Sequence, residues 1–181
     1  LARSLCPDVQ FSAEDASRSD PAFLCALFET AIENGASTVN IADTVGYAVP
    51  DEFAALVRRV AGGIRNLGDT TVSVHCHNDL GMATANSLAA LMAGAGQVEC
   101  TLNGLGERAG NAASEEIVMA LQTRRDLFGL EHGVDTRMYS KASKTVASVT
   151  GVYVPQNKPV VGRNAFVHLS LIHISEPTRL G

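Results

Sequence analysis

The sequence predicts an α/β protein in which short β-strands alternate with amphipathic helices around a parallel sheet. Four segments have the alternating or continuous apolar pattern of strands, and each is followed by apolar residues at helical spacing. The connections between the segments are short enough for parallel strands. Polar residues follow each strand, at the edge where sheets of this class place their sites.

The first two strand–helix units fill the N-terminal part of the chain. Residues 8–12 form the first predicted strand, and Asp20-Pro21 predicts a helix start because Asp caps and Pro suits the first turn. Residues 38–42 form the second strand, and Pro50 opens the second helix. The helical apolar positions are Leu24, Leu27, Phe28, Ile32, Phe53, Leu56, Val57, Val60 and Ile64.

The third and fourth units follow the same pattern. Residues 71–77 and 97–102 form strands, and the Ala-rich residues 83–93 form the helix between them. Residues 103–111 are a glycine-rich loop, and a fourth helix spans residues 114–124, with Ser114 as a possible N-cap. The apolar positions of these two helices are Leu88, Leu91, Met92, Ile117, Val118 and Leu121. Four such units correspond to half of an eightfold barrel.

The pattern changes after Asp126. Residues 136–149 can form an amphipathic helix, and residues 152–165 contain prolines, glycines and asparagines that predict an extended loop. The apolar positions of the helix are Tyr139, Ala142, Val146 and Val149. We interpret this change as the start of a second, linker subdomain.

The predicted domains are therefore residues 1–128, the barrel units, and residues 129–168, the start of the linker subdomain. Residues 169–181 contain LSLIHISEPTR, which resembles the translated read-through of a sequencing adapter. We interpret them as a non-native tail and assign no role to His173. A natural, frayed terminus is the alternative.

Composition excludes several classes of function. The chain has 181 residues, a formal net charge of -5 and 46% hydrophobic residues, which suits a globular domain with a real core. No basic stripe suggests nucleic-acid binding, and no apolar run is long enough to span a membrane. The four cysteines show no CxxC spacing, which favours free thiols and a cytoplasmic location.

The most informative motif is the pair His75 and His77 at the end of the third strand. Successive side chains of a strand point to opposite faces, so both imidazoles share one face and Cys76 points away. Two imidazoles at a strand end form half of a metal site, although strand histidines are also common as hydrogen-bonded core residues. Asp79 could orient one imidazole, cap the next helix or close a turn.

The glycine-rich loop NGLGERAGN has two interpretations. It lies between a strand and a helix, as a dinucleotide-binding loop does, but its glycines have the spacing GxGxxxG and no acidic partner follows at the expected distance. We prefer a loop whose glycines allow a tight bend that places Asn111 near the histidines. The amide oxygen of Asn111 is a ligand suited to hard cations, or it could cap the next helix.

Two further strand ends carry candidate residues. Glu14 after the first strand is a candidate acid/base group or a solvated surface carboxylate. Asp43-Thr44 after the second strand could hold a substrate carboxylate through the hydroxyl or could form a turn. Their common placement on one rim favours the functional interpretation.

Several of these segments resemble the family of 2-isopropylmalate and homocitrate synthases, and the resemblance runs from residue 1 to about His168. They are FSAED with SRSD, NIADTVGYAVP, HCHNDLGMATANSLAA, NGLGERAGNA and GRNAF. The resemblance implies the second half of a TIM (β/α)8 barrel plus the start of a linker subdomain. It also implies a divalent metal (Mg, Mn or Zn) on His75, His77 and Asn111, with Glu14 as a catalytic and substrate-binding residue and Thr44 as a substrate-binding residue.

The activity implied by the resemblance is that of an acyltransferase of leucine biosynthesis. It condenses acetyl-CoA with 3-methyl-2-oxobutanoate to give 2-isopropylmalate and CoA, in an intact enzyme expected to be a homodimer. An aspartate ligand from an RDG motif and a catalytic histidine from an HQDG motif do not occur in this sequence, so the segment alone is expected to be inactive. Alternatives are a homocitrate or citramalate synthase, a related metal-dependent lyase, or a non-catalytic nucleotide-binding α/β module.

Overall fold

The computed structural model describes residues 1–165, which form two compact units. The first unit spans Leu1–Ala113 and the second begins at Ser114. The predicted boundary between residues 128 and 129 stays a prediction. The predicted adapter-like tail and His173 lie outside the described residues.

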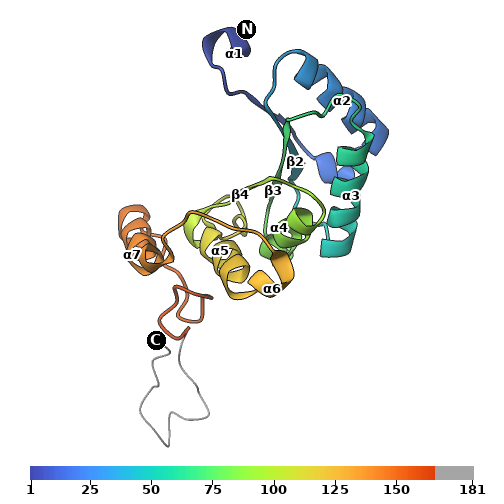
Figure 1. The fold of residues 1–181 in the computed structure, drawn as a ribbon. Helices are drawn as coiled ribbons and strands as arrows, with labels where there is room; N and C mark the ends of the chain where they lie inside the picture. Colours follow the sequence, from blue (N-terminus) through green and yellow to red (C-terminus); the bar gives the residue numbers. More distant parts are fainter. Residues whose placement is uncertain (166–181) are drawn as a thin grey trace, which may run out of the picture. The chain divides into compact units, whose positions relative to one another are not determined.

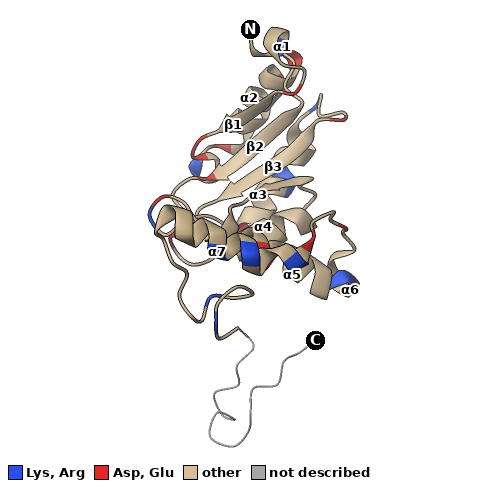
Figure 2. Cartoon of the chain, turned by 90° about the vertical axis from the view of Figure 1, so that its left-hand side faces the viewer, with Lys and Arg blue, Asp and Glu red and all other residues tan. Residues whose placement is uncertain are grey.

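The first unit is built on a four-stranded parallel sheet with the order β1-β2-β3-β4 (Figure 1). The strands are β1 (Gln10–Ala13), β2 (Thr38–Asp43), β3 (Thr71–Cys76) and β4 (Gln97–Glu99). Each strand pairs with the next one along the chain, as expected for consecutive strand–helix units. The ribbons of β1 and β3 carry no charged residue, and acidic residues lie near strand ends (Figure 2).

Three helices follow the strands in the predicted order. They are α2 (Pro21–Glu33), α3 (Pro50–Gly63) and α4 (Ala83–Met92), preceded by the single-turn α1 (Ala2–Leu5). Short 3-10 turns lie at η1 (Ala16–Arg18) and η2 (Leu102–Gly104). Helices α2 and α3 lie side by side along the sheet (Figure 1), and α3 also contacts α4. The start of α2 is as predicted, because the Asp20 carboxylate accepts hydrogen bonds from the backbone N–H groups of Ala22 and Phe23.

The hydrophobic core lies between the sheet and these helices. Residues fully or almost fully buried there include Leu24, Phe28, Val39, Ile41, Phe53, Val57, Val60, Val72 and Val74. In α4 the buried side is made of small residues and one asparagine rather than of the large apolar residues. The helix buries Ala83, Asn86, Ser87 and Ala90, whereas Met92 is 52% exposed. Small residues allow α4 to approach its neighbours closely, and the buried Asn86 donates from Nδ2 to the carbonyl of Ala48 at 2.8 Å.

The fourth strand is shorter than predicted. Its ladder with β3 ends at the pair His75 and Glu99, and the chain then turns through η2, where Asn103 adopts a left-handed φ of 63°. Thr101 continues the pairing only as a single bridge, to Ala113. The turn directs the glycine-rich loop back toward the end of β3.

The second unit contains helices α5 (Ser114–Thr123), α6 (Arg125–Phe128) and α7 (Tyr139–Thr150), with the 3-10 turn η3 (Thr136–Met138) before α7. Residues 152–165 contain neither helix nor strand, in agreement with the predicted loop, but they form several turns rather than an extended segment. Lys158 forms an ion pair with Glu116 at 2.5 Å. Helix α7 buries Tyr139, Ser143 and Ala147, while Val149, one of its apolar positions, is 80% exposed. Between residues 1 and 165, no helix is both long and apolar enough to cross a bilayer.

Candidate metal centre

The two histidines of the HxH motif meet at the C-terminal end of β3. His75 pairs within the sheet, and His77, just beyond the strand, forms a single backbone bridge with Asn111. Their Nε2 atoms lie 3.3 Å apart, and the ring planes are inclined at 89°. The predicted common side of the two imidazoles is therefore present in the structure.

The other ring nitrogen of each histidine has a partner that fixes its proton. Nδ1 of His75 lies 2.6 Å from Oε2 of Glu99, and Nδ1 of His77 lies 2.6 Å from the carbonyl oxygen of Thr44. Both partners are acceptors, so each Nδ1 carries the hydrogen and donates it. Arg108 Nη2 is 3.0 Å from Nδ1 of His77, but its two hydrogens are directed at Thr44 and Asp79.

When both imidazoles are neutral, this arrangement leaves an unshared electron pair on each Nε2. Two such nitrogens 3.3 Å apart repel each other unless a cation lies between them. Imidazole nitrogens that share a metal at about 2.1 Å, with a ligand angle of about 90–110°, are separated by about 3.0–3.4 Å. The spacing of His75 and His77 therefore fits two ligands of one metal ion.

Asn111 lies beside this pair because the glycine-rich loop folds tightly. A Cβ at Gly110 would lie 3.3 Å from the carbonyl carbon of Gly104 and closer to its oxygen, and its φ is +91°. A Cβ at Gly106 would collide with the Asn111 amide. Asn111 donates from Nδ2 to the carbonyl of Leu105, while its buried Oδ1 has no hydrogen-bond partner among the described residues.

These three atoms are candidate neutral ligands of a metal ion. In residues 1–165 there is no cluster of three or more His, Cys, Asp or Glu side chains that could hold a metal. Two imidazole nitrogens and one orphaned amide oxygen form an incomplete but chemically consistent set. A charged ligand would have to come from elsewhere in the protein.

The other two candidate residues are linked through the backbone. Asp15 donates its N–H to the Thr44 hydroxyl at 2.8 Å, which joins the end of β1 to the end of β2. Thr44 thus contributes its carbonyl to His77 and its hydroxyl oxygen to Asp15, and the hydroxyl proton is still able to donate. Glu14, adjacent to Asp15, is exposed. The structure therefore places Glu14 and Thr44 on the rim that carries the histidines.

Asp79 and Asp43 have roles that differ from the functional ones considered for them. Asp79 forms an ion pair with Arg108 at 2.8 Å, which lowers the pKa of its carboxyl group, mainly through hydrogen bonding. Asp43 is fully buried and accepts from the Ser17 hydroxyl and the Ala48 N–H, so it stabilises a turn. Asn78, rather than Asp79, accepts a hydrogen bond from the first residue of α4, the N–H of Ala83, at 3.1 Å.

Cys76 points away from the histidines, as predicted, and faces α4. The thiol is fully buried, and burial raises its pKa to about 12 despite a hydrogen bond with Ser87. A thiol that stays protonated in the apolar layer is a poor metal ligand. The metal-binding chemistry of this strand is therefore confined to the opposite face.

Sequence reasoning missed two residues of the site. Glu99 ends β4 on the same face as His75, and Arg108 bridges the glycine-rich loop to Asp79 and Thr44. The alternation of β4 could have placed Glu99 on one face, but its pairing with His75 requires the register between β3 and β4. Arg108 lies within the glycine-rich loop, and nothing in the local sequence indicates its partners.

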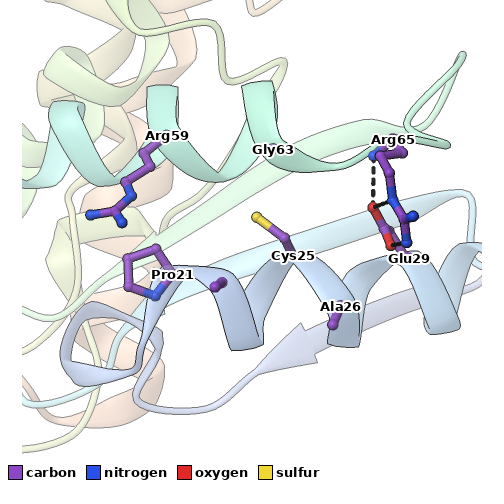
Figure 3. Close-up of a pocket in the computed structure, with 8 residues that line it drawn as sticks. Pro21, Cys25, Ala26, Glu29, Arg59, Gly63 and Arg65 are labelled. Atoms are coloured by element: carbon purple, nitrogen blue, oxygen red, sulfur yellow. Dashed lines mark hydrogen bonds and ion pairs between the residues drawn. The ribbon is translucent and has the colours of Figure 1, made fainter.

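The glycine-rich loop does not resemble a phosphate cradle. Its interior is filled by Asn111 and by the backbone of Gly104, which accepts a 2.9 Å hydrogen bond from Asn111 N–H. A separate hollow of about 420 Å³ lies between α2 and α3 and contains none of the candidate residues (Figure 3). It is lined by Pro21, Ala22, Cys25, Ala26, Glu29, Arg59, Gly63 and Arg65.

Comparison with known proteins identifies the family of the chain. The HMGL-like family model matches residues 1–146. The chain is 55% identical over 172 residues to 2-isopropylmalate synthase of Syntrophus aciditrophicus and 59% identical over 174 residues to that of Cupriavidus necator. These alignments cover 95% and 96% of the chain but only 33% and 34% of the relatives, so the chain spans about a third of their length.

Solved structures show the same fold at lower identity. Hydroxymethylglutaryl-CoA lyase from Pseudomonas aeruginosa matches with a TM-score of 0.66 and 22% identity, covering 80% of this chain and 49% of the lyase. An HMG-CoA lyase from Acinetobacter baumannii, in complex with coenzyme A and 3-methylmalate, matches with a TM-score of 0.68 and 24% identity over 89% of this chain and 54% of that one. The four strand–helix units thus correspond to half of a TIM barrel, and the chain belongs to the HMGL-like family.

Proposed function

We propose that the protein containing this chain is a 2-isopropylmalate synthase. It would condense acetyl-CoA with 3-methyl-2-oxobutanoate and water to give 2-isopropylmalate and CoA. The observation that carries the proposal is the pair of imidazoles 3.3 Å apart, in a chain 55–59% identical to 2-isopropylmalate synthases. Four free cysteines favour a reducing, cytoplasmic compartment for this reaction.

His75, His77 and Asn111 would hold a divalent cation through two Nε2 atoms and one Oδ1 atom. Such a cation would supply polarisation of the keto-acid carbonyl and stabilisation of negative charge on its oxygen. Nitrogen and oxygen donors are compatible with Mg, Mn or Zn. All three protein donors are uncharged, so they leave the positive charge of the ion available to an anionic substrate.

Thr44 and Glu14 would complete this rim for the substrate. The Thr44 hydroxyl accepts from Asp15 and can donate its proton to a substrate carboxylate. The exposed carboxylate of Glu14 is suited to acid/base work or to orienting a protonated group. We propose that the base that removes a proton from the acetyl methyl group lies outside the described residues.

The test is a CoA-release assay with the full-length protein. We expect CoA release to require a divalent metal and to be fastest, by kcat/KM, with 3-methyl-2-oxobutanoate. 2-Oxoglutarate would be preferred by a homocitrate synthase and pyruvate by a citramalate synthase. Unchanged turnover after complete removal of metal by a chelator would contradict the metal-dependent mechanism.

Variants connect this activity to the site. His75→Ala and His77→Ala should each abolish nearly all CoA release while the protein stays folded, because each removes one of two nitrogen donors. Gly62→Ala is the matched control, since a Cβ at Gly62 meets no atom within 4 Å. Full activity in either histidine variant would rule out the assigned site.

A further inference from the structure

The face of the sheet that carries His75 is mostly polar, and Ala42, the partner of His75 on β2, is its apolar residue. The other apolar side chains of the strands point to the helices, and the residues on the polar face include a complete row across four strands. The row consists of Ser12, Asn40, Ser73 and Gln97, paired in register. Barrel interiors are usually filled by branched apolar residues, so this polar face requires another explanation.

Hydrogen bonds connect the polar face from its first strand to its last. Gln97 donates to the Oε1 of Gln10 at 3.0 Å and to Ser73 Oγ at 3.1 Å. Neighbouring strands lie about 4.8 Å apart, so β1 and β4 would be separated by about 14 Å in a flat sheet. The contact between Gln10 and Gln97 therefore shows that the sheet curves around this network.

The network ends on the carboxylate that holds His75. Gln10 Nε2 donates to Oε1 of Glu99, and Oε2 of the same carboxylate accepts from Nδ1 of His75 at 2.6 Å. Both oxygens of Glu99 are thus occupied, one by β1 and one by β3. This fixes the carboxylate in the plane needed to hold the imidazole with its Nε2 toward His77.

We propose that Glu99 and Gln10 are positioning residues for the metal site: Gln10 orients Glu99, and Glu99 holds His75 in the tautomer and orientation that bind the metal. The second imidazole differs, because His77 donates to the neutral carbonyl of Thr44. The side chains of Glu99 and His75 are 31% and 27% exposed, so the protein covers most of the surface of both. This inference rests on the metal site of the proposed function.

The test is calorimetric titration of Mn²⁺ into the metal-free full-length protein. Loss of a group that orients a metal-bound histidine typically weakens metal affinity about 10- to 100-fold. We expect a loss of this size in both Glu99→Gln, which removes the charge, and Glu99→Asp, which keeps the charge but withdraws the oxygen from Nδ1. Gln10→Ala should weaken Mn²⁺ binding less, by at least about threefold.

Matched controls separate positioning from general effects. Glu33→Gln removes one exposed charge at the end of α2, and Gln122→Ala removes one exposed amide from α5; both should bind Mn²⁺ as the wild type does. The melting temperature of the metal-free protein identifies any variant that is merely destabilised. If the Glu99 variants do not fold, Gln10→Ala decides the question.

The inference would be overturned if either Glu99 variant bound Mn²⁺ as tightly as the wild type does. If the Glu99 variants do not fold, Mn²⁺ affinity equal to that of the wild type in Gln10→Ala would overturn it. Absence of Mn²⁺ binding by the wild type would overturn it as well. Failure of the proposed reaction would look different. In that case the wild type would bind Mn²⁺ and the Glu99 variants would bind it weakly, but no 2-oxo acid would release CoA.

Discussion

Gly106→Ala should damage the metal site without disturbing the backbone that carries it. Gly106 does not adopt a positive φ, so alanine fits its conformation, but the added Cβ would lie 2.8 Å from Cγ of Asn111 and closer still to Nδ2. Ordinary contacts begin at 3.4 Å, so the amide must retreat by at least about 0.6 Å. It would then lose its 3.0 Å hydrogen bond to Leu105, worth about 0.5–1.5 kcal/mol.

The displacement would also move the amide oxygen that we propose as the third metal ligand. Misplacing a functional group by about 1 Å can cost about 100-fold in rate, so we expect Mn²⁺ affinity and CoA release to fall about 10- to 100-fold. The assay is titration of the metal-free full-length protein, compared with Gly62→Ala, whose Cβ enters open space in α3. Equal Mn²⁺ affinity and activity in the two variants would refute the role assigned to Asn111.

Three further predictions concern the first unit. Arg65 lowers the pKa of Glu29 to about 2, mainly by hydrogen bonding (Figure 3), so this ion pair stabilises the fold above about pH 4.5 and the stabilisation is lost as the pH falls toward 2. In acid unfolding, the stability difference between the wild type and Glu29→Gln should vanish across that range of pH. A difference that stays constant with pH would disprove this prediction. Asp20→Ala should weaken hydrogen-exchange protection in α2 by about 1 kcal/mol, whereas Asp20→Asn should retain it. At pH 8 the buried Cys76 thiol should react with iodoacetamide at least about 100-fold more slowly than exposed Cys6, and equal rates by mass spectrometry would contradict its burial.

The features that the sequence predicts well depend on local patterns. The order of strands and helices, the shared face of His75 and His77 and the opposite face of Cys76 follow from periods of two and 3.6 residues. The tight loop that brings Asn111 beside His77 follows from its glycines. The resemblance to known synthases agrees with the family found by comparison.

The features that were missed depend on contacts between distant segments. Glu99 reaches His75 only because β3 and β4 pair in one particular register, and Gln10 reaches Glu99 only because the sheet curves. Arg108 binds Asp79 and the carbonyl of Thr44, which lie beyond the ends of two different strands. In α4 the buried residues are small, because the helix packs closely on its neighbours, and the apolar pattern alone does not indicate this.

The central claim is that His75, His77 and Asn111 bind one cation. Anomalous diffraction from crystals of the full-length protein soaked in Mn²⁺ tests it most directly. The account predicts a manganese peak within about 2.0–2.4 Å of Nε2 of both histidines and of Oδ1 of Asn111. A fully occupied manganese ion bound elsewhere, with these three atoms outside its coordination sphere, would contradict the claim.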